Sequence, residues 1–178
     1  MKKVVLIYGL VSGVVSAILL VATIPYINSA DFRKGDVLGY ASIVLTVLLV
    51  FFGVRSYREN AARAGLSFGR GFAVGILITL ISCGCHVVTF QMIYFKFVPD
   101  FGDRFAACMV ERAKTSGGDP RKIDETAKKA QRLKQLYDKP GTNAAVAFAE
   151  AFPVGLIATI LSAVILRRRE SKDENSSR

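Results

Sequence analysis

FAVGILITLISCGCHVVTFQMIYFKFV, residues 72–98, is an apolar run long enough to cross a bilayer as one α-helix. A helix needs about 18 to 20 apolar residues to span a hydrocarbon core of about 30 Å. Three further runs meet this requirement, at residues 4–27, 37–54 and 144–166. The sequence therefore predicts an all-α integral membrane protein, a bundle of four transmembrane helices in contact with the lipid bilayer.

The composition also favours a membrane domain. Of the 178 residues, 52% are hydrophobic and the mean hydropathy is +0.38, which is too apolar for an ordinary soluble domain. Many of the basic residues behind the formal charge of +10 flank the apolar runs, where they retain loops and attract anionic lipid head groups. We therefore expect no binding of nucleic acid. The three cysteines form no disulfide framework.

The first run has to be distinguished from a cleaved signal peptide. It begins with Lys2 and Lys3 and ends in a faintly cleavage-like stretch, but it is longer than the ~7 to 15 residues of a signal core, so we predict a retained anchor. With four spans, both termini lie on one side. The positive-inside rule places the termini and the second loop in the cytoplasm, because these parts hold Lys2, Lys3, Arg55, Arg58, Arg63, Arg70, Arg167, Arg168 and Arg169.

The segment 99–141 is the one sizeable part expected in water, on the outer side of the membrane. Gly117 and Gly118 divide it into two amphipathic helices, and Asp119 followed by Pro120 supplies the start of the second helix. The apolar faces hold Phe101, Phe105, Cys108, Met109 and Ala113 in the first helix, and Ile123, Ala127, Ala130, Leu133 and Tyr137 in the second.

This helical pair either caps the bundle, rests at the membrane interface or docks another chain. Residues 1–169, which include the pair, form one membrane domain in this interpretation. The polar tail 170–178 is expected to be disordered.

A polar face runs along the third span. Inside a bilayer each polar side chain must find a partner without water, and these residues recur at three- and four-residue steps, which places them on one helical face directed into the bundle. His86, the only histidine, is either a neutral bundle histidine bonded to a neighbouring span or a proton-sensitive or substrate-contacting group. The face consists of Thr79, Ser82, His86 and Thr89.

Two further polar residues extend this candidate site. Counted from the outer ends of the third and fourth spans, Gln91 and Glu150 lie at similar depth and are able to pair if the spans are neighbours. Alternatively, Glu150 sits at the membrane interface. Cys83 lies nearly on the side of His86, whereas Cys85 points elsewhere. These two ligands are too few for a metal site, so we expect neither metal nor cofactor.

Two spans carry small residues at four-residue spacing, a pattern that lets membrane helices approach closely. We expect these seams to pack within the monomer or to hold a second copy or another membrane protein. The first span has Gly9, Gly13 and Ala17, and the fourth has Ala147, Ala151, Gly155, Thr159 and Ala163.

The link between the second and third spans is the most distinctive part of the sequence. Its motif residues are Gly53, Arg55, Tyr57, Arg58, Gly65, Ser67 and Phe68. Together with Pro99-Asp100 and Pro153-x-Gly155, they resemble the domain of unknown function 4199 family. The resemblance covers essentially the whole chain and implies a small four-helix protein of the bacterial cytoplasmic (inner) membrane. It implies no activity and no catalytic residues.

Three classes of function follow from these patterns. The first is a non-enzymatic structural or assembly component that acts through helix–helix or partner contacts. The second is a small transporter or channel component that uses the polar face of the third span, and it requires an oligomer because four spans rarely enclose a pathway alone. An enzyme or redox sensor is disfavoured, since the sequence lacks a nucleophile–base pair.

Overall fold

The computed structural model of the chain describes residues 1–28, 32–60 and 67–166, and all regular structure in these residues is helical. Four long helices are α1 (Lys2–Asn28), α2 (Phe32–Asn60), α3 (Phe68–Met92) and α6 (Pro140–Leu166). A π-helical turn, η1 (Ile93–Phe97), continues α3. Two shorter helices, α4 (Phe101–Thr115) and α5 (Pro120–Tyr137), precede α6.

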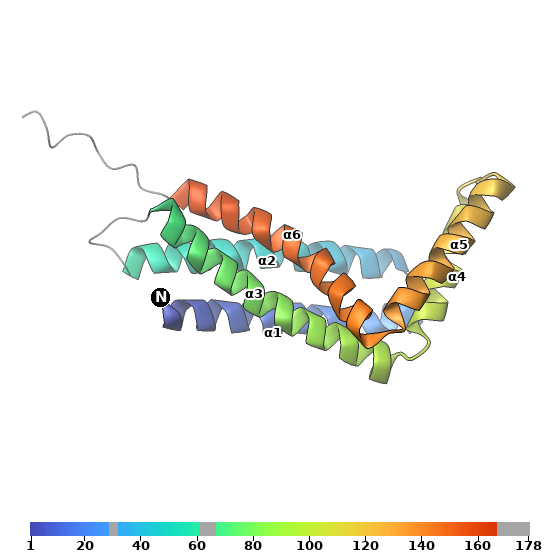
Figure 1. The fold of residues 1–178 in the computed structure, drawn as a ribbon, viewed down its shortest axis with the longest axis horizontal. Coiled ribbons are helices and arrows are strands. Elements are labelled where there is room, and N and C mark those ends of the chain that lie inside the picture. Colours follow the sequence, from blue (N-terminus) through green and yellow to red (C-terminus); the bar gives the residue numbers. More distant parts are fainter. Residues whose placement is uncertain (29–31, 61–66, 167–178) are drawn as a thin grey trace, which may run out of the picture.

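The four long helices pack side by side in one bundle (Figure 1). Helices α1 and α6 each contact both α2 and α3, so that α3 lies between α1 and α6 on one side of the bundle. The start of α1, the end of α2, the start of α3 and the end of α6 share one end of the bundle, and α4 and α5 lie at the other end (Figure 1). The four bundle helices, taken in the order α1, α2, α3 and α6, therefore alternate in direction.

Three of these helices are long and apolar enough to cross a membrane: Lys2–Pro25, Phe68–Phe97 and Pro140–Leu166. They correspond to the first, third and fourth predicted spans. The predicted second span, 37–54, lies within α2, several of whose side chains fall outside the described part of the chain. A bundle of helices is thus confirmed, and a fourth span stays a prediction.

Helix boundaries depart from the predicted spans where local chemistry extends the helices. Helix α3 begins at Phe68, because the Ser67 hydroxyl accepts a hydrogen bond from the backbone N–H of Arg70 at 3.4 Å, as an N-cap does. Helix α6 begins at Pro140 and not at 144, since proline suits the first helical position.

The bundle is apolar outside and partly polar inside, the arrangement that lipid favours. Val50 and Val54 of α2 and Val74 and Ile78 of α3 are fully buried and form one core cluster with residues of α1 and α6. Large apolar side chains on the outer faces are exposed, including Leu6, Ile7, Leu10, Val14, Ile18, Val44, Leu80, Val88, Ile157, Leu161 and Ile165. Among the described side chains, the buried polar ones are Ser12, Ser16, Thr79, Ser82, Asn143, Thr159 and Ser162.

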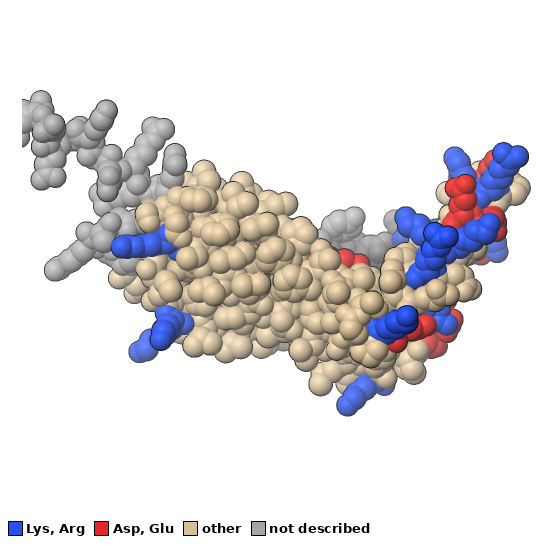
Figure 2. All heavy atoms as spheres, viewed as in Figure 1, with Lys and Arg blue, Asp and Glu red and all other residues tan. Residues whose placement is uncertain are grey.

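Helices α4 and α5 form a hairpin that projects from one end of the bundle (Figure 1). Gly117 adopts a left-handed conformation in the turn, with φ of 72°, which glycine allows at no steric cost. Asp119 accepts a hydrogen bond from the N–H of Arg121 at 3.4 Å and Pro120 follows it, so the predicted helix start is confirmed. Figure 2 shows that acidic and basic side chains gather on this hairpin, while the visible face of the bundle is nearly free of them.

Aromatic rings join the hairpin to the bundle. We call Phe90, Tyr94, Phe101 and Tyr137 the aromatic junction. Ring centroids lie 5.9 Å apart for Phe90 and Tyr137, 6.0 Å for Tyr94 and Tyr137, and 5.6 Å for Tyr94 and Phe101. Tyr94 lies in η1 and donates a hydrogen bond to Asp138 at 2.7 Å. The junction thus ties the end of α3 to both helices of the hairpin.

Candidate intramembrane binding site

The small residues of α1 bring this helix close to α3. A Cβ added at Gly13 would lie 2.7 Å from the Cβ of Cys85, and one added at Gly9 would lie 2.9 Å from the Cβ of Ile81. Ala17 faces the same side and lines a groove with Gly13 and Cys85. The seam predicted on the first span is therefore in contact with α3 of the same chain.

The small residues of α6 meet α3 from its other side. A Cβ at Gly75 would lie 2.8 Å from the Thr159 Cγ2, and a Cβ at Gly155 would overlap the Thr79 side chain. The Thr79 hydroxyl donates a hydrogen bond to the Gly155 carbonyl oxygen at 3.2 Å, and the hydroxyls of Thr79 and Thr159 lie 3.1 Å apart. Ala147 and Ala163 of the same seam are buried and Ala151 is half-buried.

A cavity of about 270 Å³ opens between the helices, next to these close contacts. All four helices of the bundle contribute to its wall. The polar groups at the wall include a carboxylate, an imidazole and hydroxyls, and the remaining wall is apolar. The lining residues are Ser16 and Leu20 of α1, Thr46 of α2, Thr79, Ser82, Cys83 and His86 of α3, and Glu150, Ala151, Val154 and Gly155 of α6.

His86 is held by a serine of the neighbouring helix. Its Nδ1 lies 3.1 Å from the Ser16 hydroxyl, and one turn away the hydroxyls of Ser12 and Ser82 lie 3.0 Å apart. Within the part of the chain that the structure describes, Nε2 of His86 makes no hydrogen bond. The ring is thus anchored through one nitrogen on a cavity wall, which agrees with a bundle histidine and leaves the other nitrogen for a ligand.

Glu150 has a different partner from the one predicted. Its Oε1 accepts a hydrogen bond from the Tyr137 hydroxyl at 2.8 Å, whereas the Gln91 amide donates to the Pro140 carbonyl at 2.7 Å. The proposed pairing of Gln91 with Glu150 is therefore wrong.

The register of the two helices explains this difference. Gly75 faces Thr159 and Thr79 faces Gly155, so each step along α3 is matched by one step back along α6. Continuing this register brings Glu150 level with Gly84, between Cys83 and His86. Helix α6 starts about one turn earlier than predicted, at Pro140, so Glu150 lies farther from the start of its helix than predicted, and its side chain is exposed.

The predicted polar face divides between two surfaces. Thr79, Ser82 and His86 line the cavity together with Glu150, but Thr89 lines a separate groove beside Cys85. The Thr89 hydroxyl donates to the Cys85 carbonyl at 2.9 Å, and a threonine that bonds its own helix needs no partner across the bundle.

The sequence does not assign a role in the site to several residues that line the cavity or bond to its lining. Ser12 and Ser16 stand four residues apart in an apolar run, a signal that places both on one helical face. No comparable signal marks Thr46. For Tyr137 the sequence indicates the apolar face of its helix but not its partner Glu150, because that contact is tertiary.

The cysteines separate as predicted. Cys83 is buried and lines the cavity, and Cys85 lines the groove beside α1. In the described ranges no three histidine, cysteine or acidic side chains come together as a metal site.

Tyr137 lies outside the spans, and contact with Glu150 at the site changes the pKa of its hydroxyl. Burial raises the pKa of its hydroxyl, and the hydrogen bond to the Glu150 carboxylate raises this pKa further. The phenol therefore stays protonated and remains a donor at neutral pH. Because Tyr137 belongs to the aromatic junction, it links the cavity to the hairpin.

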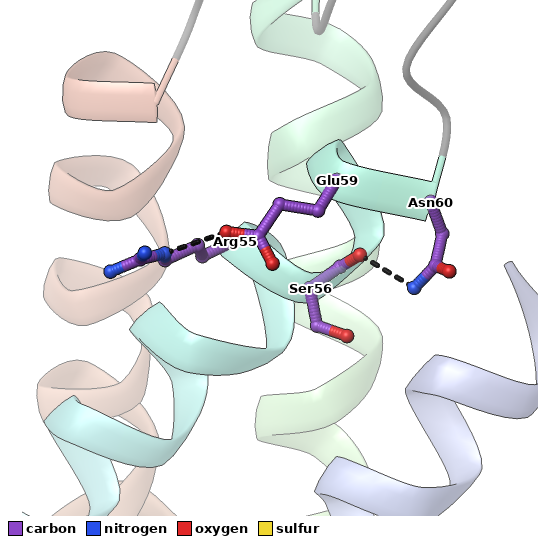
Figure 3. Close-up of polar contacts among 4 residues, drawn as sticks. All are labelled: Arg55, Ser56, Glu59 and Asn60. Atoms are coloured by element: carbon purple, nitrogen blue, oxygen red, sulfur yellow. Dashed lines mark hydrogen bonds and ion pairs between the residues drawn. The ribbon is translucent and has the colours of Figure 1, made fainter.

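The motif residues at the end of α2 make contacts within their own helix and with neighbouring helices. Arg55 donates to Glu59 at 2.9 Å and the Asn60 amide donates to the Ser56 carbonyl at 2.8 Å, each one helical turn apart (Figure 3). Gly53 allows close contact, since a Cβ there would lie 3.1 Å from the Cβ of Tyr8. Of the remaining motif residues, Tyr57 packs on the core cluster, Arg58 and Phe68 are exposed, and Gly65 lies outside the described residues.

Comparisons with known proteins give a family and no activity. The model of the family described as "Protein of unknown function (DUF4199)" matches residues 7–168, which is most of the chain. Neither the curated proteins nor the solved structures contain a match.

Proposed function

The chain belongs to the DUF4199 family, and from its geometry we propose that it is a membrane protein that binds a small ligand in the cavity between its helices. The observation that carries this proposal is the joint placement of His86 and Glu150 on one cavity wall. Ionisable side chains are costly inside a bilayer and mark binding sites, ion pathways and proton relays. The function class that fits is a component of a small transporter or channel.

The membrane arrangement belongs to the same proposal. Helix α2 serves as a fourth span, because it packs against α1, α3 and α6 along the bundle. The chain lies in a bacterial inner membrane with both termini cytoplasmic, which puts the hairpin on the outer side. Transport requires more than one copy, since four helices rarely surround a continuous pathway.

The native cysteines supply an experiment that needs no knowledge of the ligand. In a variant that keeps only Cys83, the thiol reports on the cavity, and in a matched variant that keeps only Cys85, it reports on the groove beside α1. Both variants are treated in membranes with two charged, water-borne methanethiosulfonates, the trimethylammonium-ethyl and sulfonatoethyl reagents. We expect at least one reagent to modify Cys83 and neither to modify Cys85.

Failure of both reagents at Cys83, with full reaction after unfolding in detergent, would exclude a water-accessible binding cavity. Equal reaction at Cys83 and Cys85 would count against it too, because general permeability of the bundle would then explain both. The variants must first show the helical content and the elution volume of the native protein.

A contact role is the second candidate, and the projecting hairpin favours it (Figure 1). The seams of α1 and α6 both pack against α3 of the same chain, so the hairpin offers the more accessible surface for a partner. Crosslinking in mild detergent tests this role, and a monomer that recovers no partner would count against it.

A further inference from the structure

We infer that the cavity takes a small monovalent organic cation, with the Glu150 carboxylate as its counter-ion. This inference rests on the proposed binding function and names the chemical class of the ligand. It follows from the charge of the wall, the coordination that the wall offers and the free volume.

The charge of the wall favours a cation. Among the described lining residues Glu150 is the one acidic side chain, and none is a lysine or arginine. The Glu150 side chain is exposed in the fold, and a carboxylate within a membrane-spanning helix is costly in the bilayer unless a proton or a positive charge neutralises it. The Tyr137 hydroxyl supplies one neutral donor at 2.8 Å, and in the described ranges no lysine or arginine forms an ion pair with Glu150. A cationic ligand would complete the neutralisation.

The apolar part of the wall favours an organic ion over a bare metal ion. Leu20, Ala151 and Val154 supply methyl and methylene surface beside the carboxylate. Alkali and alkaline-earth ions need several oxygen ligands to replace their hydration shell. The serine and threonine hydroxyls of α3 in the wall are already engaged, Ser82 with Ser12 and Thr79 with α6. A cation that carries its own alkyl groups matches both parts of the wall.

The size of the cavity sets an upper limit on the ligand. A volume of about 270 Å³ lies near the lower end of the ~300 to 1,000 Å³ found for small-molecule pockets. It accommodates an ion of the size of tetramethylammonium. Tetramethylammonium is therefore the probe of choice, with pivalate as an anion of similar shape and neopentanol as a neutral analogue.

The cation preference is measured as a ratio of reaction rates. In the Cys83-only variant, the rate with the trimethylammonium-ethyl reagent is divided by the rate with the sulfonatoethyl reagent. The same ratio for 2-mercaptoethanol, a small thiol free in solution, corrects for the intrinsic reactivity of the reagents. We expect a corrected preference for the cation on the order of tenfold or more, because a nearby carboxylate in a weakly polar environment attracts one reagent and repels the other.

Two substitutions and a protection assay identify the source of this preference. Glu150→Gln should bring the ratio to about one, and Glu150→Asp, which keeps the charge, should retain it. Tetramethylammonium chloride should slow modification of Cys83, whereas sodium chloride of equal ionic strength, sodium pivalate and neopentanol should not. The protection assay uses unsubstituted Glu150, so it decides the question even if the Gln variant fails to fold.

The possible results distinguish failure of the cation preference from failure of the proposed binding function. If both reagents modify Cys83 at equal corrected rates, or if pivalate or neopentanol protects as well as tetramethylammonium, the cavity is a binding site but not for cations. Protection by sodium chloride would show that the cavity binds a metal ion and not an organic cation. If neither reagent reaches Cys83, the binding function itself fails.

Discussion

Adding a single methyl group to α3 tests whether its contact with α6 holds the bundle together. Gly75 and Gly84 both lie inside α3. A Cβ at Gly75 would lie 2.8 Å from Cγ2, 3.1 Å from Oγ1 and 3.2 Å from Cβ of Thr159, whereas a Cβ at Gly84 meets nothing within 4 Å. Gly75→Ala and Gly84→Ala therefore make the same chemical change in crowded and open surroundings.

The expected magnitudes follow from two opposing effects. Replacing glycine by alanine in a helix interior favours the helix by about 0.8–1.0 kcal/mol, and overpacking a tight contact costs about 1–3 kcal/mol. Gly84→Ala has only the first effect and should stabilise the fold by up to about 1 kcal/mol. Gly75→Ala has both, so the free energies of unfolding of the two variants should differ by about 1–3 kcal/mol.

The assay is unfolding by sodium dodecyl sulfate in dodecylmaltoside micelles, followed by circular dichroism. A second substitution, Thr159→Ser, removes Cγ2 but keeps the hydroxyl that contacts Thr79 at 3.1 Å, so Gly75→Ala with Thr159→Ser should recover most of the lost stability. Equal stabilities for Gly75→Ala and Gly84→Ala would refute the close α3–α6 contact, and so would an absence of rescue.

Three shorter predictions concern groups outside the spans. Because burial and the Glu150 carboxylate raise the pKa of Tyr137 above its ordinary value of 10.0, the stability it contributes is complete below pH 10 and is lost as pH rises through the folded pKa. Tyr137→Phe should weaken this alkaline loss in a pH series of unfolding curves. Ser67→Ala should cost about 0.5–1 kcal/mol through the lost helix cap, measured by the same unfolding assay, and an unchanged midpoint would contradict the cap. Glu59→Gln should change the free energy of unfolding by less than about 1 kcal/mol, because its ion pair with Arg55 is exposed; a larger loss would show that this pair supports the end of α2.

Local chemistry made the helices predictable from the sequence. Ser67 and Asp119 each bind a backbone amide two or three residues away, so their effect is visible in the residues beside them. The same is true of the turn at Gly117, where the conformation needs a glycine. The apolar runs fix which helices are able to enter lipid, since length and composition alone decide this.

The sequence does not determine how α3 and α6 are aligned with each other at the site. Counting from the span ends places Glu150 level with Gln91, but the contacts of Gly75 with Thr159 and of Gly155 with Thr79 set a different register. Four-residue spacing shows that a helix has a close-packing face and does not show which residue of the partner it meets. The hydrogen bond between Glu150 and Tyr137 also depends on the bend between α5 and α6, and the spacing of residues within the helices does not predict this bend.

The position of the cavity follows from two contacts that hold α3 and α6 together at different positions along the bundle. At one level Thr79 packs against Gly155 with no room for a side chain on the glycine. At the other, the Gln91 amide binds the first residue of α6, and the aromatic junction occupies the space beyond. The cavity lies between these two levels, where neither the Thr79–Gly155 contact nor the Gln91–Pro140 hydrogen bond draws α3 and α6 together. Glu150 reaches from this space to Tyr137, so one carboxylate lies at the cavity and at the aromatic junction. The Tyr137 hydroxyl occupies Oε1 of this carboxylate, which leaves Oε2 as the oxygen that faces a ligand without loss of the contact to the hairpin.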